Sequence, residues 1–208
     1  ILRRASNAEW PGWAEELIPI GAPTVRYWKV SPGQSASHWE VLRQQGCMGI
    51  GGNEIGDLSE IDPTSKAELR GYYEALDTRT DRSWTPQYAA GQYWPLLREI
   101  AKGDRIVAYG SKTVLDIGTV TGEYCYDDDA DAYPHRRPVS WDGIEPLQLD
   151  TLPPDVADRL QRNSTMFEIT EEQYRAIMEA SVGKPPIAKP IQVIQTYLSA
   201  NGFHFGDW

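Results

Sequence analysis

The chain has little cysteine, little histidine and fewer basic than acidic residues. Its 208 residues include two cysteines and three histidines, and 20 Lys and Arg stand against 30 Asp and Glu. Cys47 and Cys125 lie in apolar, strand-like runs, so we expect both thiols to be reduced and buried and the protein to be cytoplasmic, in a prokaryote. The net charge of −10 argues against broad, non-specific phosphate binding, which needs many basic side chains. It does not exclude a local basic groove.

A long hydrophobic run is also missing. The mean hydropathy is −0.51, and no apolar run approaches the ~20 residues that a membrane-spanning helix needs. The first residues, ILRR, lead directly into polar sequence, which is not the pattern of a signal peptide. With 40% hydrophobic residues the chain can still bury the core of one ordinary domain. Tryptophan is abundant instead, and the eight copies make an aromatic binding site easier to supply.

The common catalytic, metal and phosphate-binding patterns do not occur. His38, His135 and His204 lack metal-ligand spacing, and neither a catalytic triad nor a deaminase signature can be found. The glycine-rich stretch 49–57 fits neither a P-loop nor G-x-G-x-x-G, which favours a loop with positive φ angles or a close backbone approach. The alternating acids at 127–131 lack the Gly and Glu of a calcium loop and favour a solvated hairpin tip. We predict no catalysis by this chain, no metal and no cofactor.

The residue pattern predicts strands separated by helices of mixed length. Capping-box spacing at 37–40 and 170–173 predicts two helix starts, and Asp62-Pro63 predicts a third. This mixture indicates an α+β domain with a curved or barrel-like sheet. The expected strands are 25–31, 47–50, 106–109, 114–126, 136–141 and 147–152, and the expected helices are 37–45, 62–77, 86–102, 154–162 and 170–181.

The stretch 103–143 holds three of these strands in succession. It ends at Trp141, immediately before the turn pair Asp142-Gly143. A large aromatic residue at such a place is either a lid on the core or a stacking platform for a flat ligand. The basic pair Arg136-Arg137 is likewise open to two interpretations, as phosphate contacts or as an exposed strand that balances the acidic loop before it.

An ordered series of motifs resembles EVE-type domains, which belong to the PUA-like superfamily together with the YTH readers. The series is YWKVSPG at 27–33, Trp39, GIGG at 49–52, IGDLSEI at 55–61, YWPLLREIAKGDRIVAYGSKTVLDIGTVTGEYCYD at 93–127 and YPHRRPVSW at 133–141. The resemblance covers roughly 24–181, with a lead-in at 1–23 and a linker and helix at 182–208. It implies a PUA-like α+β fold that binds a modified, methylated base flipped from duplex DNA.

The resemblance also implies the residues of a modified-base pocket. Trp141 matches an aromatic wall of the cage, and the loop from Val30 to Gln34 lines one side. The opposite aromatic of many relatives aligns with Gly52, so either Tyr27, Trp28 or another aromatic residue supplies that wall, or the pocket admits a larger base. The implied pocket residues are Trp141, Ser31, Val30, Gly33, Gln34, Gly52, Asn53 and Trp28, and the implied contacts to the nucleic-acid backbone are Lys112, Arg136 and Arg137.

The tail PIQVIQTYLSANGFHFGDW at 190–208 resembles the segment before the AAA+ GTPase module of McrB-like proteins. This resemblance implies a DNA-recognition part of a modification-dependent restriction protein. The implied partners are modified double-stranded DNA, a GTPase domain of the same protein and a nuclease subunit. Two alternatives are an RNA reader of the same fold, which the 2′-hydroxyl would distinguish, and an assembly module that binds no nucleic acid.

Overall fold

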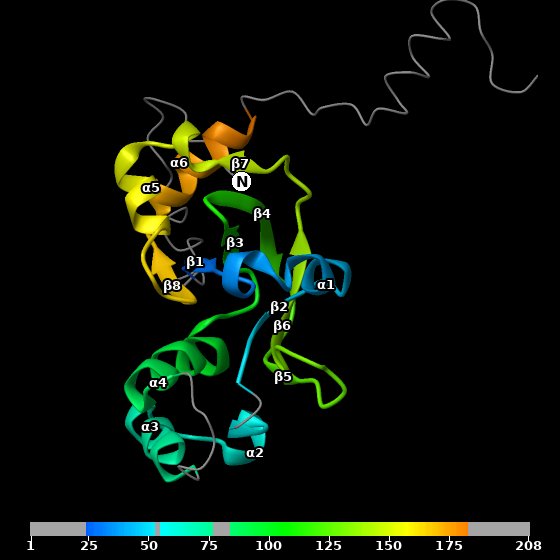
Figure 1. Ribbon diagram of the computed structural model, residues 1–208, viewed down its shortest axis with the longest axis vertical. Helices are drawn as coiled ribbons and strands as arrows, with labels where there is room; N and C mark the ends of the chain where they lie inside the picture. The colour runs from blue at the N-terminus through cyan, green and yellow to red at the C-terminus, as the bar shows by residue number, and fades with distance from the viewer. Residues whose placement is uncertain (1–23, 53–54, 77–83, 183–208) are drawn as a thin grey trace, which may run out of the picture.

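The computed structural model describes residues 24–52, 55–76 and 84–182 (Figure 1). The predicted lead-in at 1–23 and the tail at 183–208 lie outside these ranges. The elements before the central strands are β1 Tyr27–Val30, the 3-10 helix η2 Gln34–Ala36, α1 Trp39–Gln44, β2 Cys47–Ile50, α2 Leu58–Ile61, α3 Lys66–Ala75, α4 Pro86–Trp94 and the π-helix η4 Pro95–Glu99. They are followed by β3 Arg105–Gly110, β4 Thr113–Val120, β5 Cys125–Tyr126, β6 His135–Trp141, β7 Leu147–Gln148, the 3-10 helix η5 Leu149–Thr151, α5 Pro154–Leu160, β8 Met166–Ile169 and α6 Glu171–Val182.

The strands form one curved sheet. Its order is β2-β6-β4-β3-β1-β8, with β5 paired to β6 and β7 paired to β4. β1 and β3 are parallel, and the other pairs are antiparallel. Figure 1 shows α2, α3 and α4 together at one end of the molecule and α5 and α6 at the other. The predicted fold class, α+β with a curved, barrel-like sheet flanked by helices, is confirmed.

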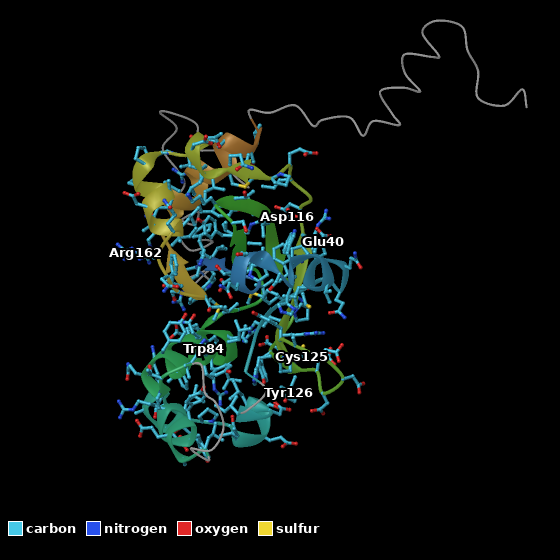
Figure 2. The ribbon with its side chains drawn as sticks, in the orientation of Figure 1. Glu40, Trp84, Asp116, Cys125, Tyr126 and Arg162 are labelled. Atoms are coloured by element: carbon cyan, nitrogen blue, oxygen red, sulfur yellow. The ribbon has the colours of Figure 1, made fainter. Side chains whose placement is uncertain are left out.

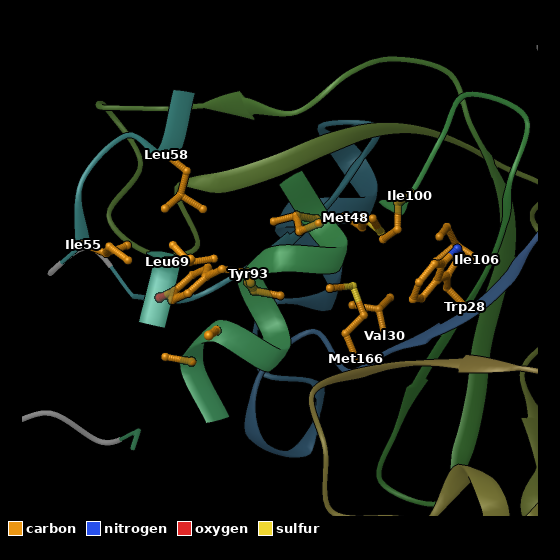
Figure 3. Packing of buried hydrophobic residues seen from close by; sticks show 14 of the residues in the cluster. Trp28, Val30, Met48, Ile55, Leu58, Leu69, Tyr93, Ile100, Ile106 and Met166 are labelled. Atoms are coloured by element: carbon orange, nitrogen blue, oxygen red, sulfur yellow. The ribbon is translucent and has the colours of Figure 1, made fainter. Parts of the chain in front are cut away.

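Two hydrophobic cores flank β1 because its side chains alternate between the faces of the sheet. Trp28 and Val30 enter the core that contains α2, α3 and α4, and Figure 3 shows both beside Met166 and Ile106. Tyr27 packs against the second core, which is built around β3, β4, α5 and α6. Within the described residues, no helix is long and apolar enough to cross a membrane.

The helix starts expected at 86 and 154 agree with α4 and α5. Of the three starts predicted from capping signals, one agrees with the structure and two differ. The capping box of α6 is confirmed, because Thr170 Oγ1 accepts from the Gln173 amide and Gln173 Oε1 accepts from the Thr170 amide. The helix expected at 62 begins later, since Asp62 ends α2 with a left-handed φ of 47° and Ser65 caps α3. The box at 37–40 is wrong, because His38 precedes α1 without a side-chain cap.

Other boundaries differ for local reasons. The long strand expected at 114–126 divides at Gly122, where a Cβ would lie 2.8 Å from Pro138 Cγ, so β4 and β5 are separate. The helix expected to reach 102 ends as a π-helix that starts at Pro95, which lacks the amide hydrogen of a regular turn. β8 was not predicted. Cys47 is buried as expected, whereas Cys125 is exposed because β5 lies at the margin of the sheet.

Candidate functional site

A cleft of ≈ 840 Å³ opens between the two ends of the molecule. Figure 2 shows Trp84 on the helical side, near α4, and Arg162 on the side that carries α5 and β8. Residues next to β2 and β8 both line it, although these are the edge strands of the sheet, so the curl of the sheet brings its two edges to one opening. The lining comprises Lys29, Ser31, Gly33, Gln34, Ser35, Gly51, Gly52, Trp84, Tyr88, Tyr109, Gly110, Ser111, Tyr133, Gln161, Arg162, Asn163, Ser164 and Thr165.

Four aromatic side chains face this cleft from different elements. Trp84 lies just before α4 and Tyr88 in its first turn, and their rings meet edge-on with centroids 5.2 Å apart. Tyr109 comes from the end of β3, where the register with β4 shifts between Ala108 and Tyr109. Tyr133 precedes β6. Aromatic faces that are partly exposed in a cleft suit a flat, conjugated ligand.

Tyr133 is held in an unusual backbone conformation beside two glycines. Its φ is 60°, and its ring lies 3.8 to 4.0 Å from where a Cβ of Gly51 would be. A Cβ on Gly33 would lie 3.0 Å from the Tyr133 hydroxyl, so only glycine allows this approach without movement. The carbonyl of Tyr133 accepts from Arg136 Nε at 2.9 Å. Burial raises the pKa of Tyr133, so its hydroxyl stays protonated and neutral at pH 7.

The backbone at Gly51 and Gly52 is fixed by buried side chains behind it. The Tyr93 hydroxyl lies 2.8 Å from the Gly51 carbonyl, and His135 Nε2 lies 2.8 Å from the Gly52 carbonyl. Because a carbonyl only accepts, both groups donate. His135 Nδ1 then faces the hydroxyl of Tyr124 at 2.9 Å. This wall of the cleft is therefore rigid, as a binding site requires.

The loop 161–165 is tied to β1 and α4. The Ser31 amide donates to the Thr165 carbonyl at 2.7 Å, and the Thr165 amide donates to the Tyr88 hydroxyl at 3.0 Å. Gln92, which is buried, accepts from the Met166 amide at 2.7 Å. These bonds fix the loop against β1 and α4.

Lys29 is the buried cation of the cleft. Its side chain is 2% exposed, and its ammonium donates to the Ser164 carbonyl at 2.6 Å. The same nitrogen lies 5.3 Å from the Tyr109 ring centroid and 5.1 Å from that of Phe167. Burial lowers the pKa of Lys29 to about 8. A lysine in this setting destabilises the fold, because its charged form is removed from water.

Replacing Lys29 with methionine should therefore stabilise the protein at neutral pH. The lowered pKa corresponds to roughly 3 kcal/mol, of which the lost bond to Ser164 offsets a part, so we expect a gain of ~1–3 kcal/mol. Between a folded pKa of about 8 and the ordinary 10.5, the unfolded chain binds more protons, so wild-type stability rises with pH across this window. Urea unfolding at pH 7 and at pH 10 checks both statements. The variant's advantage should shrink at the higher pH, and a variant less stable than wild type at pH 7 contradicts the prediction.

The electrostatics of the cleft differ from those of the chain as a whole. Lys29 lies inside it, and Arg162 is exposed at its rim. None of the described residues that line the cleft is Asp or Glu, although the chain carries a net charge of −10. The cleft is thus a local positive region suited to an acceptor-rich or anionic ligand.

The predicted pocket residues divide between the cleft and the core. Ser31, Gly33, Gln34 and Gly52 line the cleft together. Val30 and Trp28 are each 2% exposed and lie in the core, where Trp28 Nε1 donates to Asp104 Oδ2 at 3.0 Å. Tyr27, the other aromatic considered, stacks on Tyr174. Asn53 lies outside the described residues.

Trp141 lies away from the cleft. It lines a small apolar recess with Trp39, whose ring meets it edge-on at 4.9 Å between centroids. A Cβ on Gly118 would lie 2.8 Å from Trp141 Cε3, so the indole ring packs directly over that glycine. Its Nε1 is buried and has no hydrogen-bond partner among the described residues. The placement favours packing; a role in base stacking stays a prediction.

The predicted backbone contacts occupy different environments. Arg136 and Arg137 are 7% and 2% exposed; Arg136 pairs with Asp127 of the acidic loop, and Arg137 donates to the Leu96 carbonyl. Their guanidinium groups thus support β6 from inside. Lys112 is exposed in the turn after Ser111, which lines the cleft, so it is positioned near the rim.

Sequence reasoning missed the cleft's aromatic and basic residues. Trp84 follows a polar segment, Tyr133 ends the acidic loop, and Tyr109 is one of several apolar residues in its strand. Lys29 gave the clearest signal, because a single charge stands inside the apolar strand YWKV. Arg162 gave none, since an exposed arginine after a short helix is common.

A model of the family described as "Domain of unknown function (DUF8426)" matches residues 28–168. No curated protein matches the chain. Similar solved structures include protein Atu2648 from Agrobacterium tumefaciens, at 18% identity over 79% of this chain and 99% of that chain with a TM-score of 0.39. Rpa0253 from Rhodopseudomonas palustris is 16% identical over 80% and 99%, with a TM-score of 0.44. The YTH domain of the Zygosaccharomyces rouxii MRB1 protein, in complex with N6-methyladenosine RNA, is 14% identical over 75% and 86%, with a TM-score of 0.41.

Proposed function

The chain belongs to the family described as a domain of unknown function, DUF8426, and we propose that it recognises a modified base flipped out of duplex DNA. The observation that carries this proposal is the cleft. Its volume of ≈ 840 Å³ lies within the ~300–1,000 Å³ of typical small-ligand sites. Aromatic side chains, half-buried glycine backbone and two cations converge in it, without an acidic side chain from the described residues.

The energetics of base flipping suit these residues. Extrusion of a base costs a few kcal/mol of lost stacking, and stacking on an aromatic face returns ~1–3 kcal/mol per base. Trp84 and Tyr133 supply aromatic ring faces from separate parts of the chain. In this proposal they take the place of the aromatic wall that relatives have at position 52, where this chain has glycine. A methyl group on the base gains ~25 cal/mol per Å² of surface that leaves water. A modified base thus gains more from such a cleft than a plain one does.

The wider biological role follows from the resemblances in the sequence. We infer that the chain is the DNA-recognition part of a McrB-like restriction protein, because the EVE-like motifs precede a tail similar to the segment before its GTPase module. In this role the chain binds modified DNA, and the GTPase domain and a nuclease subunit act on it. The exposed side chains Arg162 and Lys112 are the proposed phosphate contacts at the rim.

A binding panel tests the proposal. The full chain is titrated by fluorescence anisotropy with short duplexes that carry 5-methylcytosine, 5-hydroxymethylcytosine, N6-methyladenine or no modification, and with matched RNAs. We expect at least one modified duplex to bind about 10-fold more tightly than its plain counterpart. A modified RNA that binds better than every duplex supports the RNA reader instead. Equal affinity for all of these duplexes and RNAs supports the alternative in which the chain is an assembly module.

A further inference from the structure

We propose that Lys29 reads the flipped base directly and selects one with two adjacent hydrogen-bond acceptors, a carbonyl oxygen among them. A 5-modified cytosine, with O2 beside N3, is such a base, whereas N6-methyladenine is not. The inference rests on the proposed function and names the substrate class of the same cleft. It is carried by the burial of Lys29, its place in the cleft and its incomplete set of partners.

The ammonium group of Lys29 has hydrogen-bond donors to spare. An ammonium has three donors and no acceptor, and one N–H is used on the Ser164 carbonyl at 2.6 Å. Within the part of the chain that the structure describes, Lys29 forms no ion pair, and its ammonium lies against the rings of Tyr109 and Phe167. A buried charge in such surroundings is costly unless it gains a partner. A ligand in the cleft is the partner that the position allows.

How deeply a cation lies in the cleft decides whether it contacts the base or a phosphate. Lys29 is 2% exposed, while Arg162 is exposed at the rim. A flipped nucleotide inserts its base into the pocket while its phosphates stay with the strand outside. Lys29 therefore meets the base edge, and Arg162 meets the backbone.

The two free donors of Lys29 define which base edges fit. Cytosine presents N3 and O2 side by side, and guanine presents O6 and N7, the pair that lysine commonly contacts in DNA. Adenine places its N6 amino donor beside both N1 and N7, and methylation of N6 retains an N–H there. An ammonium opposite that edge can donate to one ring nitrogen only. The N6 N–H beside this nitrogen is itself a donor and cannot accept a bond from the ammonium. The cleft therefore favours a modified cytosine over N6-methyladenine.

The experiment compares wild type with Lys29→Met on the same duplexes at several salt concentrations. We expect wild type to bind the 5-methylcytosine or 5-hydroxymethylcytosine duplex at least ~10-fold more tightly than the N6-methyladenine duplex. The variant should lose that preference while its salt slope stays that of wild type. Unfolding curves verify that the variant is folded, and Lys102→Met, at an exposed lysine outside the cleft, is the matched control.

Two results overturn the inference while leaving the proposed function in place. One is a wild-type preference for N6-methyladenine. The other is a uniform loss of affinity by Lys29→Met across all duplexes with a shallower salt slope, which identifies a phosphate contact. If wild type prefers no modified duplex at all, the proposed function fails first, and the inference falls with it.

Discussion

Replacing Trp84 with alanine is expected to weaken binding of the preferred modified duplex by roughly 5- to 150-fold, which corresponds to the ~1–3 kcal/mol of one base stacked on an aromatic face. Trp84 lines the cleft just before α4. Its ring meets Tyr88 edge-on and lies 5.6 Å from the ring of Tyr93 between centroids, so neighbouring rings hold the indole in place. Affinity for an unmodified duplex should change much less, because no flipped base is held. Anisotropy titrations of both duplexes measure the difference.

Trp141→Ala is the matched control, since it removes the same side chain from outside the cleft. Trp141 packs over Gly118 and against Trp39 but is only half-buried, so we expect a loss of stability below the ~3–5 kcal/mol of a fully buried tryptophan. Binding by the folded protein should stay within about threefold of wild type. The opposite pattern, with unchanged melting and binding lost as in Trp84→Ala, assigns Trp141 to the base pocket, as the resemblance implies. Equal binding by both variants contradicts the stacking role of Trp84.

The fold could be predicted where local pattern and final packing agree. The strand at 47–50 matches β2 in full, because Gly46 ends the preceding helix and Cys47, Met48 and Ile50 form a short apolar run. The start of α3 was misplaced for a local reason. Both Asp62-Pro63 and Ser65 carry helix-start signals, and α2 uses Asp62 at its end, so Ser65 caps α3 instead. β8 was missed, because it is short and its partner among the described strands is the distant β1.

The site was harder to predict than the fold. The loop at 31–34 and Gly52 followed from the resemblance and do share the cleft, but Trp84 and Tyr133 reach it only through the curl of the sheet. Arg136 and Arg137 look like a surface pair in the sequence. Neighbouring strand residues point to opposite faces, and both faces of β6 are covered here, so both guanidinium groups are buried. Burial of a charge depends on long-range packing that no local pattern records.

Arg137 has the largest expected effect on stability. Its Nε donates to the Leu96 carbonyl at 2.5 Å, and its terminal nitrogens donate to the carbonyls of Leu97 and Gly122 at 3.1 and 3.2 Å. It thus joins β6 to the π-helix η4, which follows α4. Alanine would leave a cavity and buried carbonyls without donors, at a cost of about 1–3 kcal/mol for each unsatisfied group and roughly 3–5 kcal/mol in total.

For a domain of this size, that loss should lower the melting temperature of Arg137→Ala by ~6–20 °C. Lysine at position 137 keeps the charge but not the fork of donors, so Arg137→Lys should fall between alanine and wild type. Arg175→Ala, which breaks an exposed pair with Glu171 one helical turn away, should cost less than ~0.5 kcal/mol. Thermal and urea unfolding of the three variants rank them. If Arg137→Ala melts as Arg175→Ala does, then β6 and η4 are held together by apolar packing alone.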